Sequence, residues 1–123
     1  MNTLAESGLR IEPSQQEGMA VLSAAGDVDA ANAHLLREAV IAAIESGAPA
    51  VVVDLAQVGY VDSVGLGTLV VSLKRAAEQR TALRLVVTSP QIEKVLKITG
   101  LLSVFDIYSD QQSAIRGQSQ KSG

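Results

Sequence analysis

The residues best suited to chemistry lie together in residues 62–67, where the polar pair Asp62 and Ser63 begins an apolar, helix-like segment. The first turn of a helix presents backbone N–H groups without partners, and the positive end of the helix dipole favours an anion there. A phosphate on Ser63 would add about −1.5 to −2 charge at neutral pH. The start of this predicted helix could therefore accommodate an anion at Ser63. Asp and Ser are also common helix caps, so the pattern alone leaves a purely structural role open.

Two glycines, Gly65 and Gly67, follow Ser63 in the first turns of the same predicted helix. Each weakens a helix by up to about 1 kcal/mol relative to alanine. They fit a backbone or a bulky partner that must approach closely, and they also fit a helix packed tightly on its own sheet. Asp27 and Asp29 lie in an earlier polar segment. If that segment lies nearby, its two carboxylates would make the surroundings of Ser63 acidic.

Few other residues support catalysis. His34 is the single histidine, and a solvated residue in the first turn of another predicted helix explains it best. The chain has no cysteine, which excludes disulfides and thiolate metal sites. The G-x-G formed by Gly65 and Gly67 lacks the third glycine and the basic phosphate-binding residue of nucleotide motifs. We therefore expect no enzyme activity, no metal site and no cofactor.

Composition narrows the class of protein further. A length of 123 residues suits one domain, and 47% apolar residues can form a core without covalent staples. A net charge of −3 and only 2% aromatic residues argue against nucleic-acid binding. No apolar run approaches the roughly 18 residues of a membrane helix, and the N-terminus does not resemble a signal peptide. We expect a cytoplasmic protein without direct membrane insertion.

The elements that must position Ser63 follow from apolar periodicity and turn residues. Strands are predicted at residues 9–13, 19–25, 50–55, 83–87 and 104–108, and Gly26 is expected to end the second of them. Helices are predicted from Asn32, the expected N-cap, to residue 46, from residue 62, from residue 90 and over residues 110–116, with a link at 56–60. The first two strands can pair as a hairpin. The later helices and strands alternate, which indicates parallel strands joined by helical crossovers. We expect one α/β domain over residues 1–116 and a flexible tail over residues 117–123.

Three short stretches resemble motifs of the STAS domain family (sulfate transporter and anti-sigma factor antagonist). Residues 62–67, D-S-V-G-L-G, follow a strand and resemble the D-S-[ST]-G-[LIV]-[GA] signature of the antagonist type. Residues 26–29 resemble G-[ED]-[LIV]-D, and residues 96–101 resemble [LF]-x-[ILM]-[ST]-G-L. The match runs from about Gly8 to Ala114. It implies a small mixed, largely parallel sheet packed with about four helices, mainly on one side.

The resemblance also implies a role. In antagonists of this family, the serine after the Asp is phosphorylated by the anti-sigma factor, itself a serine kinase that uses ATP; here that serine is Ser63. The unphosphorylated antagonist binds the anti-sigma factor and releases the sigma factor, phosphorylation ends the binding, and a phosphatase acting on phospho-Ser63 restores it. The partner-facing residues implied for this chain are Asp27, Asp29, Asp62, Ser63, Val64, Gly65 and Leu66.

Val64 departs from the family pattern, which usually has Ser or Thr after the phosphorylated serine. This difference bears on partner choice more than on the switch. Three alternatives remain open: a STAS scaffold or cytoplasmic transporter subunit that is never phosphorylated, a small-molecule sensor that binds a nucleotide phosphate near Ser63, and an unrecognised enzyme. The sequence has no Lys or Arg close to Ser63, which counts against tight anion binding.

Overall fold

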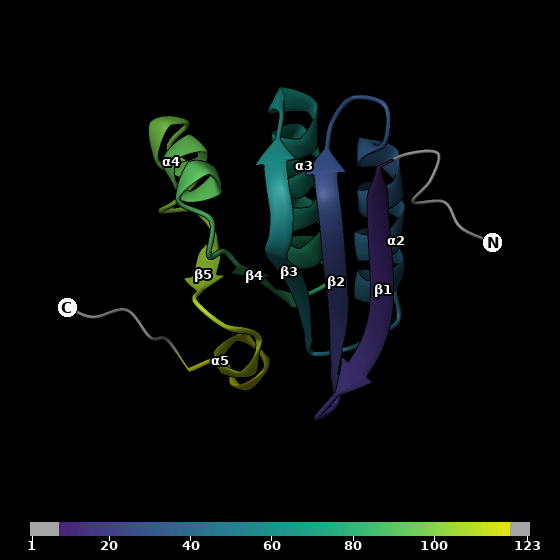
Figure 1. The fold of residues 1–123 in the computed structure, drawn as a ribbon. Helices are drawn as coiled ribbons and strands as arrows, with labels where there is room; N and C mark the ends of the chain where they lie inside the picture. The colour runs from purple at the N-terminus through teal and green to yellow at the C-terminus, as the bar shows by residue number, and fades with distance from the viewer. Residues whose placement is uncertain (1–7, 119–123) are drawn as a thin grey trace.

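The computed structural model describes residues 8–118 and contains a five-stranded sheet with helices on both faces (Figure 1). The strands follow one another in chain order, and their bounds are β1 Leu9–Gln16, β2 Met19–Val28, β3 Ala50–Val61, β4 Ala82–Val86 and β5 Asp106–Tyr108. β1 pairs antiparallel with β2, and each later pair is parallel. The predicted α/β class, with a hairpin followed by parallel crossovers, is confirmed. The tail expected at residues 117–123 lies, from residue 119 onward, outside the described residues.

The helices that join the parallel strands are α2 Ala33–Glu45, α3 Ser63–Glu78 and α4 Pro90–Ile98. Crossovers between parallel strands are right-handed, and the strand order advances in one direction, so these helices cover the same face of the sheet. The remaining helix, α5 Gln111–Arg116, packs on the opposite face. The expectation that the helices lie mainly on one side is confirmed.

Alternate side chains of β3 enter two separate apolar clusters, because successive residues of a strand point to opposite faces. Val51, Val53 and Leu55 belong to the larger cluster, beneath α2, α3 and α4. Val52 points the other way, into a smaller cluster beneath α5 that also contains Val21, Val86, Tyr108, Ala114 and Ile115. β3 is therefore covered on both faces. The start of α3, which follows the carboxyl end of β3, is attached to this buried central strand.

β2 and β3 both run beyond their predicted ends. The prediction that Gly26 ends the second strand is wrong, because β2 continues to Val28. Gly26 has a φ of +116°, and a Cβ there would collide with the carbonyl oxygen of Gly8, so glycine lets the strand bend without ending. β3 likewise continues through the predicted link at residues 56–60, and its extension pairs with the end of β2 and buries Val58 and Val61.

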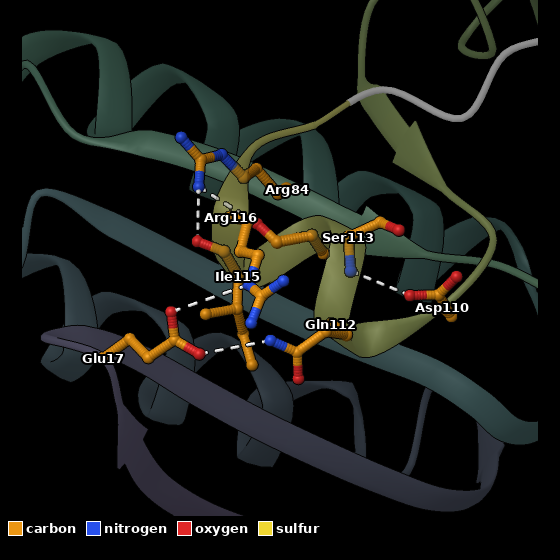
Figure 2. A network of polar contacts seen from close by, with 8 residues as sticks. Glu17, Arg84, Asp110, Gln112, Ser113, Ile115 and Arg116 are labelled. Carbon is orange, nitrogen blue, oxygen red and sulfur yellow. Dashed lines mark hydrogen bonds and ion pairs between the residues drawn. The ribbon is translucent and has the colours of Figure 1, made fainter.

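Polar contacts at both ends fix α5 on the second face of the sheet (Figure 2). The carboxylate of Asp110 accepts a hydrogen bond of 2.8 Å from the Ser113 amide and so caps the first turn. At the other end, the guanidinium of Arg84 on β4 donates to the carbonyl oxygen of Ala114 at 3.0 Å. A cation is favourable at this end because the helix dipole is negative there.

The turn between β1 and β2 adds a third anchor for α5 (Figure 2). Glu17 forms an ion pair with Arg116 at 3.8 Å and accepts a hydrogen bond from Gln112 at 3.1 Å. Glu17 adopts a φ of +53°, which is unusual for a residue with a side chain. Its side chain thus ties the opening hairpin to the last helix, and α5 stays on the face opposite α3.

Within residues 8–118, no helix has both the length and the apolar character needed to cross a membrane.

Candidate functional site

Ser63 is the first residue of α3, at the carboxyl end of the central strand β3, and its side chain is exposed. Asp62 is the N-cap, and its Oδ1 accepts a hydrogen bond of 2.9 Å from the Gly65 amide. Among the described residues, the Ser63 hydroxyl and the amides of Ser63 and Val64 have no hydrogen-bond partner. The site therefore combines an accessible hydroxyl with two backbone donors that can receive an anion.

The second oxygen of Asp62 connects this helix start to another segment of the chain. Its Oδ2 accepts a hydrogen bond of 3.0 Å from the amide of Ala30, which lies 32 positions earlier in the β2–α2 loop. The Asp62 amide in turn donates to the carbonyl oxygen of Val28 at 3.0 Å. The tips of β2 and β3 lie side by side (Figure 1), so Asp27 at the end of β2 and Asp29 in the following loop lie near the start of α3.

Asn32 organises the β2–α2 loop from within. It occupies the N-cap position of α2, as predicted, although its side chain makes no cap hydrogen bond. Its Oδ1 accepts from the Asp29 amide at 2.9 Å and its Nδ2 donates to the Asp27 carbonyl at 3.0 Å. The residue is only 1% exposed. A buried amide that satisfies two loop groups stabilises one loop conformation.

Every backbone N–H from residue 29 to residue 33 has an acceptor inside the protein. The Asp29 carbonyl accepts from the amides of Asn32 and Ala33 at 3.1 and 2.8 Å, and its Oδ1 accepts from Ala31 at 3.0 Å. Asn32 and Asp62 accept the other two. The loop therefore presents carboxylates to its surroundings and has no spare amide for an anion, in contrast to the start of α3.

The structure separates the predicted partner-facing residues into exposed and internal ones. Ser63 and Asp27 are exposed, Val64 is 48% exposed, and Asp29 and Asp62 are half-buried. Gly65 and Leu66 are buried; the Leu66 side chain belongs to the core beneath α3 and cannot form part of an exposed surface in this conformation. The ion pairs of residues 8–118 involve none of the three aspartates, so the acidic charge near Ser63 is not neutralised internally.

The two glycines of the α3 start differ in their surroundings. A Cβ on Gly65 would lie 2.8 Å from Cγ1 of Val28, so tight packing against the sheet explains this glycine. A Cβ on Gly67 would meet no atom within 4 Å. Gly67 lies between Val64 and Val71, which is 49% exposed, at helical spacing of three and four residues. An open apolar strip thus runs along α3 from Ser63. Val71 is not among the predicted site residues, because helical spacing places it off the core stripe without indicating what would cover it.

Other ionisable residues contribute no chemistry at this site. His34 is exposed on α2, in agreement with its interpretation as a solvated helix residue. Within the part of the chain that the structure describes, no group of three or more His, Cys, Asp or Glu residues could hold a metal ion.

Comparison with known proteins assigns the class. The STAS domain family model matches residues 10–114, and the chain belongs to this family. Over 108 residues the chain is 30% identical to the anti-sigma-B factor antagonist of Bacillus subtilis (strain 168), covering 88% of this chain and 98% of that relative.

Solved structures share the same architecture. The crystal structure of an anti-sigma factor antagonist from Mycobacterium paratuberculosis has a TM-score of 0.82 and 25% identity, covering 90% of this chain and 94% of that one. The Bacillus cell fate determinant SpoIIAA in its phosphorylated form has a TM-score of 0.67 and 18% identity, covering 88% of this chain and 99% of that one. The second likeness, at this identity, shows the fold alone.

Proposed function

We propose that this protein is a cytoplasmic anti-sigma factor antagonist whose partner binding is ended by phosphorylation of Ser63. In the unphosphorylated state it binds an anti-sigma factor that is itself a serine kinase, and the sigma factor is released. A phosphatase acting on phospho-Ser63 restores binding. The observation that carries the proposal is the exposed, unpaired Ser63 hydroxyl at the start of α3, in a chain whose relatives bear the antagonist name.

The fold can accept a phosphate at this position. The free amides of Ser63 and Val64 and the positive end of the α3 dipole favour an anion at the first turn. SpoIIAA, which shares the fold, has been solved in a phosphorylated form, and this supports a fold that carries phosphate without losing its architecture. The proposed switch therefore acts on the complex, with the folded domain left intact.

Electrostatics provides the reason for release. The partner surface includes the exposed Asp27, Ser63 and Val64 together with the half-buried Asp29, and it is acidic before modification. We expect a neutral partner surface opposite Ser63, which would offer no cation to pair with a phosphate. A phosphate would add about −1.5 to −2 charge beside these carboxylates and in the middle of the contact. Placing uncompensated charge in an interface costs several kcal/mol, which is enough to dissociate a complex of moderate affinity.

The decisive experiment incubates the purified protein with its cognate anti-sigma kinase and ATP and measures intact mass. We expect one phosphate per chain in the wild type and none in Ser63→Ala. Ser103→Ala is the matched control, because Ser103 is also exposed but lies on the α4–β5 connection, and it should be labelled like the wild type. Full labelling of Ser63→Ala would show that the acceptor is a different residue. A wild type that gains no phosphate would instead favour a scaffold that is never phosphorylated.

A further inference from the structure

The carboxylate of Asp62 makes hydrogen bonds to two backbone segments that are distant in sequence. Oδ1 accepts from Gly65 in α3 at 2.9 Å and Oδ2 accepts from Ala30 in the β2–α2 loop at 3.0 Å. Both oxygens are therefore occupied inside the protein, and the side chain is half-buried. A carboxylate used in this way is poorly placed to receive a partner's donor, although the sequence places Asp62 among the partner-facing residues.

The geometry around Asp62 explains why such a bridge is needed. The last pairing between β2 and β3 joins Val28 to Val61, and the Asp62 amide adds a hydrogen bond to the Val28 carbonyl. Beyond this point the two segments separate: the one after β2 leads into α2, and the one after β3 leads into α3. The bond from Ala30 to Asp62 continues the connection past the end of the sheet. It joins the loop that carries Asp29 to the turn that carries Ser63.

We propose that Asp62 is a positioning residue for partner binding, which holds the loop of residues 29–32 against the start of α3 so that both segments form one preorganised surface. The proposal rests on the proposed function. Asn32 gives the loop its internal conformation, and Asp62 sets the place of the loop relative to Ser63. Preorganisation raises affinity because the partner does not have to order the loop on binding.

Asp62→Asn tests this role by changing one atom. Asn is as good an N-cap as Asp, so the bond from Gly65 can remain, but the new NH2 group cannot accept from Ala30. Asp62→Ser is the second variant, because its hydroxyl can cap the helix and is too short to reach Ala30. Asp110→Asn is the matched control. Asp110 caps α5 through Ser113, and among the described residues its carboxylate makes no hydrogen bond to another segment.

Two measurements are made on each variant: hydrogen exchange of the Ala30 amide in the free protein, and the Kd for the anti-sigma kinase. In both Asp62 variants we expect Ala30 to exchange about tenfold faster or more, since a hydrogen bond to a charged group is lost. We expect the Kd to rise about tenfold as the loop loosens, while the domain remains folded. Asp110→Asn should change neither measurement.

The outcomes separate the positioning role from direct contact and from failure of the proposed function. A raised Kd with unchanged Ala30 exchange would make Asp62 a contact residue and overturn the positioning role. Faster Ala30 exchange with an unchanged Kd would also overturn it, because the loop would then be loosened without consequence for binding. If the wild type does not bind the kinase at all, the proposed function fails, and the exchange of Ala30 still reports whether Asp62 holds the loop.

Discussion

Gly65 lies so close to Val28 that a Cβ atom at this position would be 2.8 Å from Cγ1 of the valine. The same atom would also lie 2.8 Å from Cγ1 of Val61. Both valines are buried core side chains at the paired ends of β2 and β3. The start of α3 thus packs tightly against the carboxyl ends of β2 and β3. This contact fixes the position of Ser63 relative to the strands.

Gly65→Ala should destabilise the fold by about 1–3 kcal/mol, because β-branched side chains in a packed core cannot move aside cheaply. Gly67→Ala is the matched control in the same helix. A methyl group there meets open space, and helix propensity should stabilise the protein by up to about 1 kcal/mol. Urea denaturation of both variants measures the difference. A Gly65→Ala protein as stable as the wild type would refute the tight contact.

Ser63→Glu should bind the anti-sigma kinase about ten- to a hundredfold more weakly than the wild type, since a charge without a countercharge in an interface is costly and a carboxylate carries less charge than phosphate. Ser63→Ala should bind regardless of ATP, because no phosphate can be added. Titration calorimetry gives the affinities, and circular dichroism checks the fold. Tight binding by Ser63→Glu would argue against a charge switch. An unfolded Ser63→Glu protein would indicate that the switch works through disorder.

Val71→Ser should weaken kinase binding about tenfold if the partner covers the apolar strip of Val64, Gly67 and Val71 on α3, because fully burying a valine side chain contributes about 1.5–3 kcal/mol. The comparison variant is Ile98→Ser. Ile98 is 73% exposed, but it lies on α4 rather than on α3. Its replacement should leave the Kd unchanged. Equal effects of the two substitutions would show that the strip on α3 has no special part in binding.

Asn32→Ala should lower the free energy of unfolding by about 1–3 kcal/mol, because the buried amide pairs with both Asp27 and Asp29 and its loss leaves loop groups without partners. His34→Ala, an exposed neighbour on α2, should change stability by less than about 0.5 kcal/mol. Chemical denaturation distinguishes the two. A neutral effect of Asn32→Ala would mean that water replaces the amide without cost.

The start of α3 illustrates how much of the site could be predicted from sequence. Asp62 and Ser63 were placed at a helix start from local signals, and the structure puts them there as N-cap and first residue. The sequence could not establish that Asp27 and Asp29 lie close to Ser63, because this proximity depends on how β2 and β3 pair. Val71 lies off the apolar stripe of the predicted helix, but its alignment with Val64 on an open surface became clear only in the structure.

The length of β3 also could not be predicted from the sequence. The sequence indicated the centre of β3 from its β-branched run, but not the continuation to Val61. That extension is mixed in polarity, and it becomes a strand because β2 bends at Gly26 and offers a partner for it. The backbone hydrogen bonds of this extension are made with β2, a segment distant in sequence. Local sequence patterns do not indicate which distant segments will pair.

The sequence by itself determined the order of the elements, the class of fold and the place of Ser63 at the start of a helix, because caps, glycines and apolar periodicity act over a few residues. Only the tertiary structure decided which glycine is required for packing, that the side chain of the N-cap residue Asn32 holds the preceding loop, and that Asp62 connects residues 32 positions apart. These roles depend on contacts between segments that only the folded sheet brings together.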